Sequence, residues 1–262
     1  MKNYTNKILN MDCIEGMKLL PSNSIDLTVT SPPYDKLRTY NGYSFKFEET
    51  ANELFRITKE GGVVVWVVGD STIKGSESGT SFRQALYFKD IGFNLHDTMI
   101  FQKKNPIPQN HNRYEQCFEY MFVFSKGKPK TFNPIRVETK NGGKAFDWGK
   151  RNKLDDSQCR RHREDSEVIV CNKTKIHNNI FEYSIGGQVI GHPATFPENL
   201  AKDHILTWSN ENDIVLDPFM GSGTTAKMAL LNNRKYVGFE ISKEYCELAN
   251  KRLNTIDNYQ NM

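Results

Sequence analysis

The chain has 262 residues, of which 37% are hydrophobic and 25% are charged, and its formal net charge is +4 at pH 7. This length suits one large core with an inserted subdomain, and no apolar stretch approaches the roughly 20 residues of a membrane-spanning helix. The first seven residues lack the charged-then-apolar pattern of a secretory signal, so we expect a cytoplasmic location and no membrane partner. The five cysteines are odd in number and lack CxxC pairing, which favours reduced thiols over disulfides or a metal site.

Predicted strands and helices alternate through the first 125 residues. The alternating apolar run Ile25–Thr30 predicts a strand, and Phe47–Lys59 predicts an amphipathic helix closed by Gly61 and Gly62. The continuous β-branched run Val63–Asp70 is typical of a strand buried on both faces of a parallel sheet. A further helix is predicted over 81–88, and further strands over 97–104 and 119–126. This alternation predicts a doubly wound α/β sheet.

The sequence TSPPY, residues 30–34, ends the first of these strands. Prolines cannot donate to a sheet ladder, and each restricts the residue before it, so the strand must stop here in a stiff, extended shape. A rigid turn is the simplest explanation of two adjacent prolines. A hydroxyl and an aromatic ring held at the carboxyl end of a strand nevertheless indicate a site.

Regular periodicity fades between residues 126 and 183. Residues 126–175 hold 14 Lys and Arg against 7 Asp and Glu, a net charge of +7, so the rest of the chain sums to −3. A stretch of this length is too long for a simple loop, so we expect an inserted subdomain. Its basic character fits a phosphate-binding face, although a solvated charged loop is the commoner fate of such runs.

Regular pattern returns after the basic segment and forms a βαβ unit. The predicted elements are a helix over 196–209, a strand over 213–218, a helix from Thr224 and a strand over 235–240. Between the last two strands, Gly221-x-Gly223-x-x-Ala226 matches a relaxed nucleotide-binding spacing, and Glu240 lies 19 residues after Gly221.

The acidic Asp217 stands beside these glycines, where the pyrophosphate of a dinucleotide would lie. A carboxylate there repels an anion and attracts a cation, which favours S-adenosylmethionine, whose ribose could bind Glu240. Alternatively, Asp217 and Glu240 only cap helices, although Ser242 is better placed than Glu240 to cap the helix that follows it.

The TSPPY and DPFMGSGTT segments together resemble the amino-methyltransferases of DNA, which methylate the exocyclic nitrogen of cytosine or adenine. The catalytic motif precedes the glycine loop, as in the permuted beta arrangement of that family. The resemblance covers nearly the whole chain outside the basic segment. It implies a mostly parallel, Rossmann-like methyltransferase sheet with a catalytic half over 1–125, an inserted target-recognition region over 126–183 and a cofactor-binding half over 184–262.

The resemblance also implies roles for individual residues. The catalytic pocket would be formed by Ser31, Pro32, Pro33 and Tyr34. The S-adenosylmethionine site would include Asp12, Cys13, Phe196, Asp217, Pro218, Phe219, Gly221, Gly223, Thr224 and Glu240. For Asp12 a helix-capping box with Glu15 is an equal alternative. DNA contacts are expected from Arg113, Lys144, Lys150, Arg151, Arg160, Arg161 and Arg163.

Ser31 is the residue that bears on the base. In the family that the chain resembles, serine before the prolines goes with cytosine-N4 and an acidic or amide residue with adenine-N6, so we expect N4 methylation of a flipped-out cytosine in double-stranded DNA. Methylation of N6 of adenine stays open, as do methylation of protein glutamine and a catalytically inactive DNA-binding module. Methylation at the ring carbon of cytosine is disfavoured because it needs an attacking cysteine, and no Pro-Cys pair is present. The sequence leaves open a restriction endonuclease partner and a choice between monomer and homodimer.

Overall fold

The structure is a computed structural model that describes residues 1–33, 45–106, 108, 112–147, 153–154, 160–161, 168–185 and 197–260. The chain divides into two compact units. Unit 1 comprises Met1–Asn133 and Asn179–Met262, and unit 2 comprises Pro134–Asn178. No helix among the described residues is long and apolar enough to cross a membrane.

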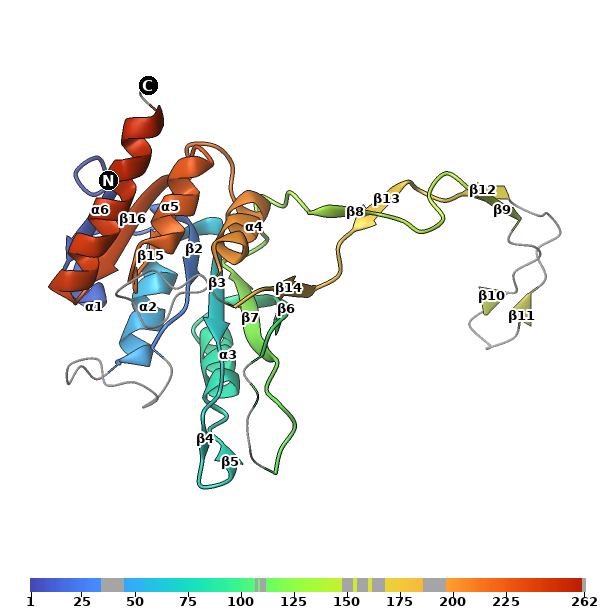
Figure 1. Ribbon diagram of the computed structural model, residues 1–262, viewed down its shortest axis with the longest axis horizontal. Coiled ribbons are helices and arrows are strands. Elements are labelled where there is room, and N and C mark those ends of the chain that lie inside the picture. The colour runs from blue at the N-terminus through green and yellow to red at the C-terminus, as the bar shows by residue number, and fades with distance from the viewer. Residues whose placement is uncertain are drawn as a thin grey trace. The chain divides into compact units, whose positions relative to one another are not determined.

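Unit 1 contains helices on both faces of a central sheet (Figure 1). Its elements are β1 (Lys7–Asn10), α1 (Cys13–Lys18), β2 (Ile25–Thr30), α2 (Phe47–Ile57), β3 (Thr58–Val68), β4 (Thr72–Ile73), β5 (Ser76–Glu77), α3 (Thr80–Asp90), β6 (Asn94–Lys103), β7 (Phe118–Ser125), β14 (Ile180–Tyr183), α4 (Glu198–Trp208), β15 (Ile214–Asp217), α5 (Thr224–Leu231), β16 (Lys235–Glu240) and α6 (Lys243–Gln260).

The described part of the sheet has eight strands in the order β1-β16-β15-β2-β3-β7-β6-β14. Neighbouring strands from β1 to β3 pair in parallel, as do β14 and β6, whereas β7 is antiparallel to both of its neighbours. The predicted mostly parallel α/β sheet is therefore confirmed. Because β2 and β15 are neighbours, the two halves of the chain meet in the middle of the sheet.

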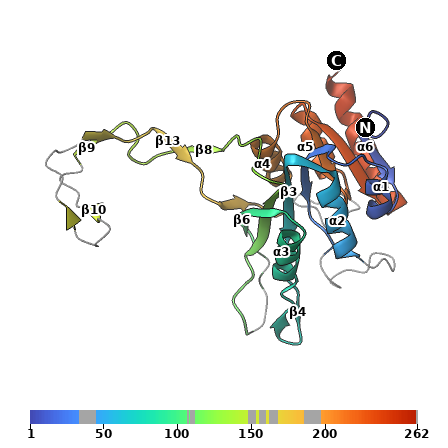
Figure 2. The ribbon, with the colours of Figure 1, turned by 180° about the vertical axis from the view of Figure 1, so that it is seen from behind.

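Alternating residues of β3 bury into two cores, one on each face of the sheet. Val63, Val65 and Val67 lie in a core with residues of α4, α5 and α6. Val64 and Trp66 lie in a second core with residues of α1, α2 and α3. Figure 2 shows these helix layers from behind. Burial on both faces explains why this segment is continuously apolar.

The boundary between α2 and β3 differs from the sequence prediction. The helix ends at Ile57, and the residues from Thr58 onward, including Gly61 and Gly62, belong to β3. These glycines lie where the register between β2 and β3 shifts, and Gly61 has a left-handed φ of 76°. They serve an irregularity of the strand, and the prediction that they close the helix was wrong.

Unit 2 is built from short two-stranded ribbons. Its strands are β8 (Arg136–Glu138), β9 (Ala145–Asp147), β10 (Lys153–Leu154), β11 (Arg160–Arg161), β12 (Val168–Val170) and β13 (Thr174–Ile176). Among the described residues of unit 2, β8 pairs with β13, β9 with β12 and β10 with β11, and each pairing is antiparallel. Unit 2 is shorter than the expected region 126–183. At the carboxyl end of that region, β14 pairs with β6 in the central sheet and so belongs to unit 1.

Candidate active site

The carboxyl ends of β2 and β15 lie side by side. Leu27 and Thr28 pair in parallel register with Val215 and Leu216, so the two strands end at the same edge of the sheet. The Oγ1 of Thr30 donates a hydrogen bond of 2.7 Å to Oδ1 of Asp217. The end of the TSPPY strand and the start of the glycine loop, nearly two hundred residues apart in the sequence, therefore lie in contact.

Asp217 holds this junction together from the inside. Its side chain is only 1% exposed, and it accepts bonds from Thr30, from Oγ1 of Thr225 at 2.8 Å and from the backbone N–H of Phe219 at 3.0 Å. Burial raises the pKa of Asp217 to about 6, against the effect of the hydrogen bonds from the two threonines. The carboxylate thus joins β2, the glycine loop and α5. Because Asp217 is buried, a cofactor would interact with its charge rather than with an exposed surface of its side chain.

The two motif glycines shape the loop after β15. Gly221 and Gly223 have left-handed φ values of 52° and 81°, which side chains rarely adopt. Gly223 is the N-cap of α5, and a Cβ there would lie 3.0 Å from Cβ of Ala249 on α6. The loop therefore turns tightly into the first turn of α5, where backbone N–H groups are left without intrahelical partners.

Glu240 closes the far side of the glycine loop. It ends β16, and its two carboxylate oxygens accept from the backbone N–H groups of Gly221 and Ser242, each at 2.8 Å. Burial raises its pKa, while the backbone bonds act in the opposite direction. Ser242 accepts from the N–H of Tyr245 at 3.4 Å, as expected of a cap for α6, so the side chain of Ser242, rather than that of Glu240, caps this helix.

Asp12 caps α1 at the same edge of the sheet. Its Oδ1 accepts from the N–H groups of Ile14 and Glu15 at 2.8 and 3.1 Å. The capping half of the prediction is therefore confirmed, but Glu15 pairs with Lys18. Since Asn10 pairs with Glu240 between β1 and β16, Asp12 follows a strand that ends beside the glycine loop. Cys13 follows it and is 5% exposed, so this side chain is part of the core.

Of the four predicted catalytic residues, the structure describes three. Ser31 and Pro33 are half-buried, and Pro32 is buried. Tyr34 lies outside the described residues, as does Phe196 of the predicted cofactor site.

The aromatic ring of Phe219 belongs to a cluster that supports the loop from below. Phe219 and Phe45 meet edge to face, with ring centroids 5.3 Å apart, and Trp66 lies 6.3 Å from Phe219. Trp66 is fully buried, and its indole N–H donates to Gln84 at 2.9 Å. Phe219 therefore acts as a packing residue for the loop, in addition to any contact with a cofactor.

Arg113, one of the expected DNA contacts, and Asn105 of the same loop both have structural partners. Arg113 pairs with Glu77 at 3.7 Å and donates to the carbonyl of Gly75, which ties its loop to the β4–β5 hairpin. Asn105 exchanges two hydrogen bonds with the backbone of Ile185, at 2.5 and 2.8 Å. Both residues therefore position loops in the described structure.

The other expected DNA contacts belong to unit 2. Lys144 is exposed, and Arg160 and Arg161 form β11. Lys150, Arg151 and Arg163 lie outside the described residues. Among the residues that the structure describes, no group of three His, Cys, Asp or Glu side chains could hold a metal ion.

Sequence reasoning missed the two threonines that flank the motifs. Thr30 and Thr225 are both fully buried, and both donate to Asp217. The available signal was their place in the motifs: one precedes Ser31, and the other ends the GSGTT run. Their roles emerge only when the two segments are seen together.

The loop and the residues around it fit S-adenosylmethionine. Tight glycines would let a ligand approach the backbone closely, the carboxylate of Glu240 would offer acceptors to ribose hydroxyls at the loop, and the buried charge of Asp217 would favour a cationic group. A dinucleotide would instead bring its pyrophosphate up to two carboxylates.

Comparison with known proteins agrees with this geometry. A family model described as DNA methylase (N6_N4_Mtase) matches residues 25–251. The orphan methyltransferase M.BamHII of Bacillus amyloliquefaciens is 61% identical over 236 residues, which cover 88% of this chain and 89% of that protein. The DNA adenine methyltransferase YhdJ of Escherichia coli is 28% identical over 268 residues, covering 98% of this chain and 85% of that protein. The solved M1.HpyAVI-SAM complex matches with a TM-score of 0.65 and 26% identity, over 94% of this chain and 98% of that one.

The family model spans most of the chain, and it includes both the TSPPY strand and the glycine loop. The chain therefore belongs to the N6/N4 DNA methylase family and is a DNA methyltransferase that uses S-adenosylmethionine.

Proposed function

We propose that the enzyme methylates the exocyclic N4 amine of a cytosine that is flipped out of double-stranded DNA. The observation that carries this proposal is the position of Ser31 directly after β2, next in the chain to Thr30, which bonds to Asp217 at the start of the glycine loop. A hydroxyl can both accept from the amine and donate to the neighbouring ring nitrogen of cytosine, whereas a carboxylate only accepts. The base assignment therefore stands on the chemistry of one side chain.

The exocyclic amine is a poor nucleophile because its lone pair is delocalised into the ring. Acceptors aimed at the amine protons, here Oγ of Ser31 and a carbonyl of Pro32 or Pro33, favour a pyramidal nitrogen. That nitrogen would attack the methyl carbon of S-adenosylmethionine, the C–S bond electrons would leave with the sulfur, and the methylated amine would then lose a proton to solvent water. Holding the two reactants in line is worth about 7–11 kcal/mol of the barrier.

The target base must leave the duplex to reach this pocket. We assign Tyr34, next in the chain after Pro33, to stack on the flipped base, a contact worth about 1–3 kcal/mol. The stiff prolines favour this assignment because they fix the direction in which the chain leaves β2.

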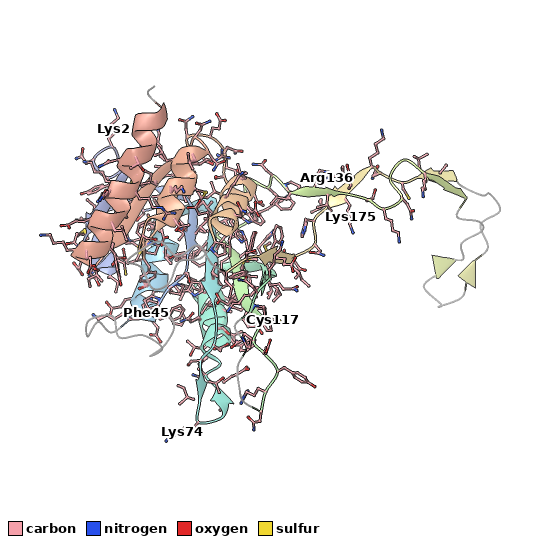
Figure 3. The ribbon with its side chains drawn as sticks, viewed as in Figure 1. Lys2, Phe45, Lys74, Cys117, Arg136 and Lys175 are labelled. Atoms are coloured by element: carbon pink, nitrogen blue, oxygen red, sulfur yellow. The ribbon has the colours of Figure 1, made fainter. Side chains whose placement is uncertain are left out.

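Unit 2 is proposed as the target-recognition region. On its β8–β13 ribbon, Ile176 pairs with Arg136 and Lys175 with Val137, so two basic residues lie on neighbouring strands (Figure 3). Arg136 is held in place by hydrogen bonds to Thr174 at 3.0 and 3.1 Å. Basic side chains position a protein on phosphates, and other side chains then read the base edges.

Methylation of N6 of adenine is the second candidate, favoured by the name of the relative YhdJ, a DNA adenine methyltransferase. The proposed place of action is the compartment that holds the DNA, which is the cytoplasm in the bacteria from which these relatives come. A restriction endonuclease partner and a monomeric or homodimeric state are compatible with this function.

One experiment tests the base. Unmethylated DNA is incubated with the enzyme and S-adenosylmethionine labelled in the methyl group, and the digested nucleosides are identified by mass spectrometry. We expect label in N4-methyl-2′-deoxycytidine. Label in N6-methyl-2′-deoxyadenosine would replace the base assignment, and label only in protein would contradict a DNA substrate. An enzyme with Ser31→Ala serves as the control and should lose most of the label.

A further inference from the structure

Three groups from different parts of the chain donate to the carboxylate of Asp217. Thr30 ends β2, Phe219 belongs to the glycine loop after β15, and Thr225 lies in the first turn of α5. Asp217 itself ends β15. This single buried group therefore joins the segment that carries Ser31 to the segment that surrounds the cofactor.

The hydrogen bond of Thr30 is not a general consequence of burying a threonine in this strand. Thr28, two residues earlier on β2, is also fully buried, but its hydroxyl has no hydrogen-bond partner among the described residues. Thr30, by contrast, donates at 2.7 Å to a carboxylate. A hydrogen bond to a charged acceptor contributes more than one between neutral groups, so this contact can hold a fixed distance.

Thr225, on α5, bonds to the same carboxylate of Asp217. Its hydroxyl lies 2.8 Å from Oδ2 of Asp217 and 3.2 Å from the carbonyl oxygen of Val29, the residue before Thr30. The first turn of α5 thus contacts both the carboxylate and the backbone of the catalytic strand. The two threonines hold Asp217 by one oxygen each.

We propose that Thr30 is a positioning residue that sets the separation between the amine pocket of Ser31–Pro33 and the methyl donor in the glycine loop. Pro32 and Pro33 have no backbone N–H, so neither can hold this segment to the sheet by donating a backbone hydrogen bond. A displacement of about 1 Å in a reacting pair can cost on the order of 100-fold in rate. The proposal rests on methyl transfer at this edge of the sheet, as proposed above, and holds for either base.

The test compares Thr30→Val, which removes the hydroxyl but keeps the shape, with Thr30→Ser, which keeps the hydroxyl. Single-turnover methyl transfer is measured at saturating DNA and cofactor, together with the Kd for S-adenosylmethionine, and rates are normalised to the fraction of protein that binds cofactor. We expect Thr30→Val to slow transfer by about 10-fold to 100-fold, with the cofactor Kd changed by less than about threefold. Thr30→Ser should stay within about threefold of the wild-type rate.

The matched control is Thr28→Val, which makes the same chemical change at a buried threonine without a hydrogen-bond partner and should leave the rate unchanged. The proposal is overturned if Thr30→Val keeps the wild-type rate, if Thr28→Val or Thr30→Ser loses as much, or if the cofactor Kd rises in proportion to the lost rate. Should Thr30→Val fail to fold, Thr225→Val and Thr225→Ser must show the same split, or the proposal fails. Wild-type enzyme that does not methylate DNA would instead overturn the proposed function, and the nucleoside product tests the base separately.

Discussion

Asp217 is a titratable group whose environment opposes its charge. Its pKa is raised from 3.8 to about 6 by burial, so the folded protein holds a proton between pH 4 and 6 that the unfolded chain has lost. The contribution of this group to stability is therefore greatest at low pH and declines as the pH rises through 6. At neutral pH the buried charge costs about 3 kcal/mol by this linkage.

The variant Asp217→Asn lacks this titration but keeps an acceptor for Thr30 and for the N–H of Phe219. We expect its free energy of unfolding to exceed that of wild type by about 1 kcal/mol near pH 4.5, and by about 3 kcal/mol near pH 7.5, where the carboxylate of the wild type is charged. Urea unfolding at several pH values without cofactor measures the difference. Thr28→Val, which changes a buried side chain without a charge, should follow the wild-type pH dependence. A difference between Asp217→Asn and wild type that stays constant over this range would contradict the role given to burial.

At the scale of elements, the last helix holds the cofactor loop by a side chain that no motif contains. Arg252 of α6 donates to the carbonyl of Ser222 at 3.0 Å and to Oγ1 of Thr224 at 3.3 Å, and it pairs with Glu198 of α4. Lys227 of α5 pairs with the same carboxylate at 2.7 Å. Burial on its own would raise the pKa of Glu198, but the bonds and charges of Lys227 and Arg252 lower it overall.

Arg252→Ala should therefore loosen the loop and three helices together. We expect a loss of about 1–3 kcal/mol in the free energy of unfolding and weaker binding of S-adenosylmethionine, measured by urea unfolding and by calorimetry. Lys243→Ala is the matched control on the same helix, because Lys243 is largely exposed and pairs with Glu247 only at 3.9 Å; it should change stability by less than about 0.5 kcal/mol. Equal effects of the two variants would show that Arg252 contributes no more than a surface charge.

The elements differ in how far their sequence predicts them. The valines of β3 predict a strand buried on both faces, because one local pattern fills both cores. The end of α2 was predicted wrongly because Gly61 and Gly62 are required by contacts with other segments of the chain rather than by the helix. A Cβ on Gly61 would lie 2.9 Å from Cβ of Lys130. The pairing of β14 with β6 was equally invisible, since it joins segments about 80 residues apart. In the site, the motifs indicated the residues of the pocket and of the glycine loop, but the hydroxyls of Thr30 and Thr225 acquire a partner only in three dimensions.

At the scale of the whole molecule, charge is divided unevenly between the parts of the chain. Unit 2, residues 134–178, holds 11 Lys and Arg against 7 Asp and Glu, a net charge of +4, whereas the rest of the chain sums to zero. If unit 2 contacts DNA phosphates, its lysines displace cations that are condensed on the DNA. Each phosphate contact then contributes about −0.9 to the slope of log affinity against log salt. The salt dependence of binding then counts the contacts that a variant has lost.

The combined variant Lys144→Ala, Lys173→Ala and Lys175→Ala removes three exposed charges of unit 2. We expect weaker DNA binding with a slope reduced by about 1 for each lost contact, and so by up to about 3 in all. The transfer rate at saturating DNA and the Kd for S-adenosylmethionine should not change, because none of these residues contributes to the site at β2 and β15.

Lys2, Lys7 and Lys235 offer the matched control, since they are exposed as well. Lys7 and Lys235 are the first residues of the parallel strands β1 and β16. They therefore lie at the amino ends of the strands, whereas the site lies at the carboxyl ends. Changing these three lysines to alanine removes the same net charge from unit 1. If DNA binding responded to net charge alone, the two triple variants would lose affinity and slope equally, and unit 2 would have no special part in it. A slope that falls only when the lysines of unit 2 are removed identifies contacts with phosphates, because a uniform change in the field of the molecule cannot distinguish the two sets.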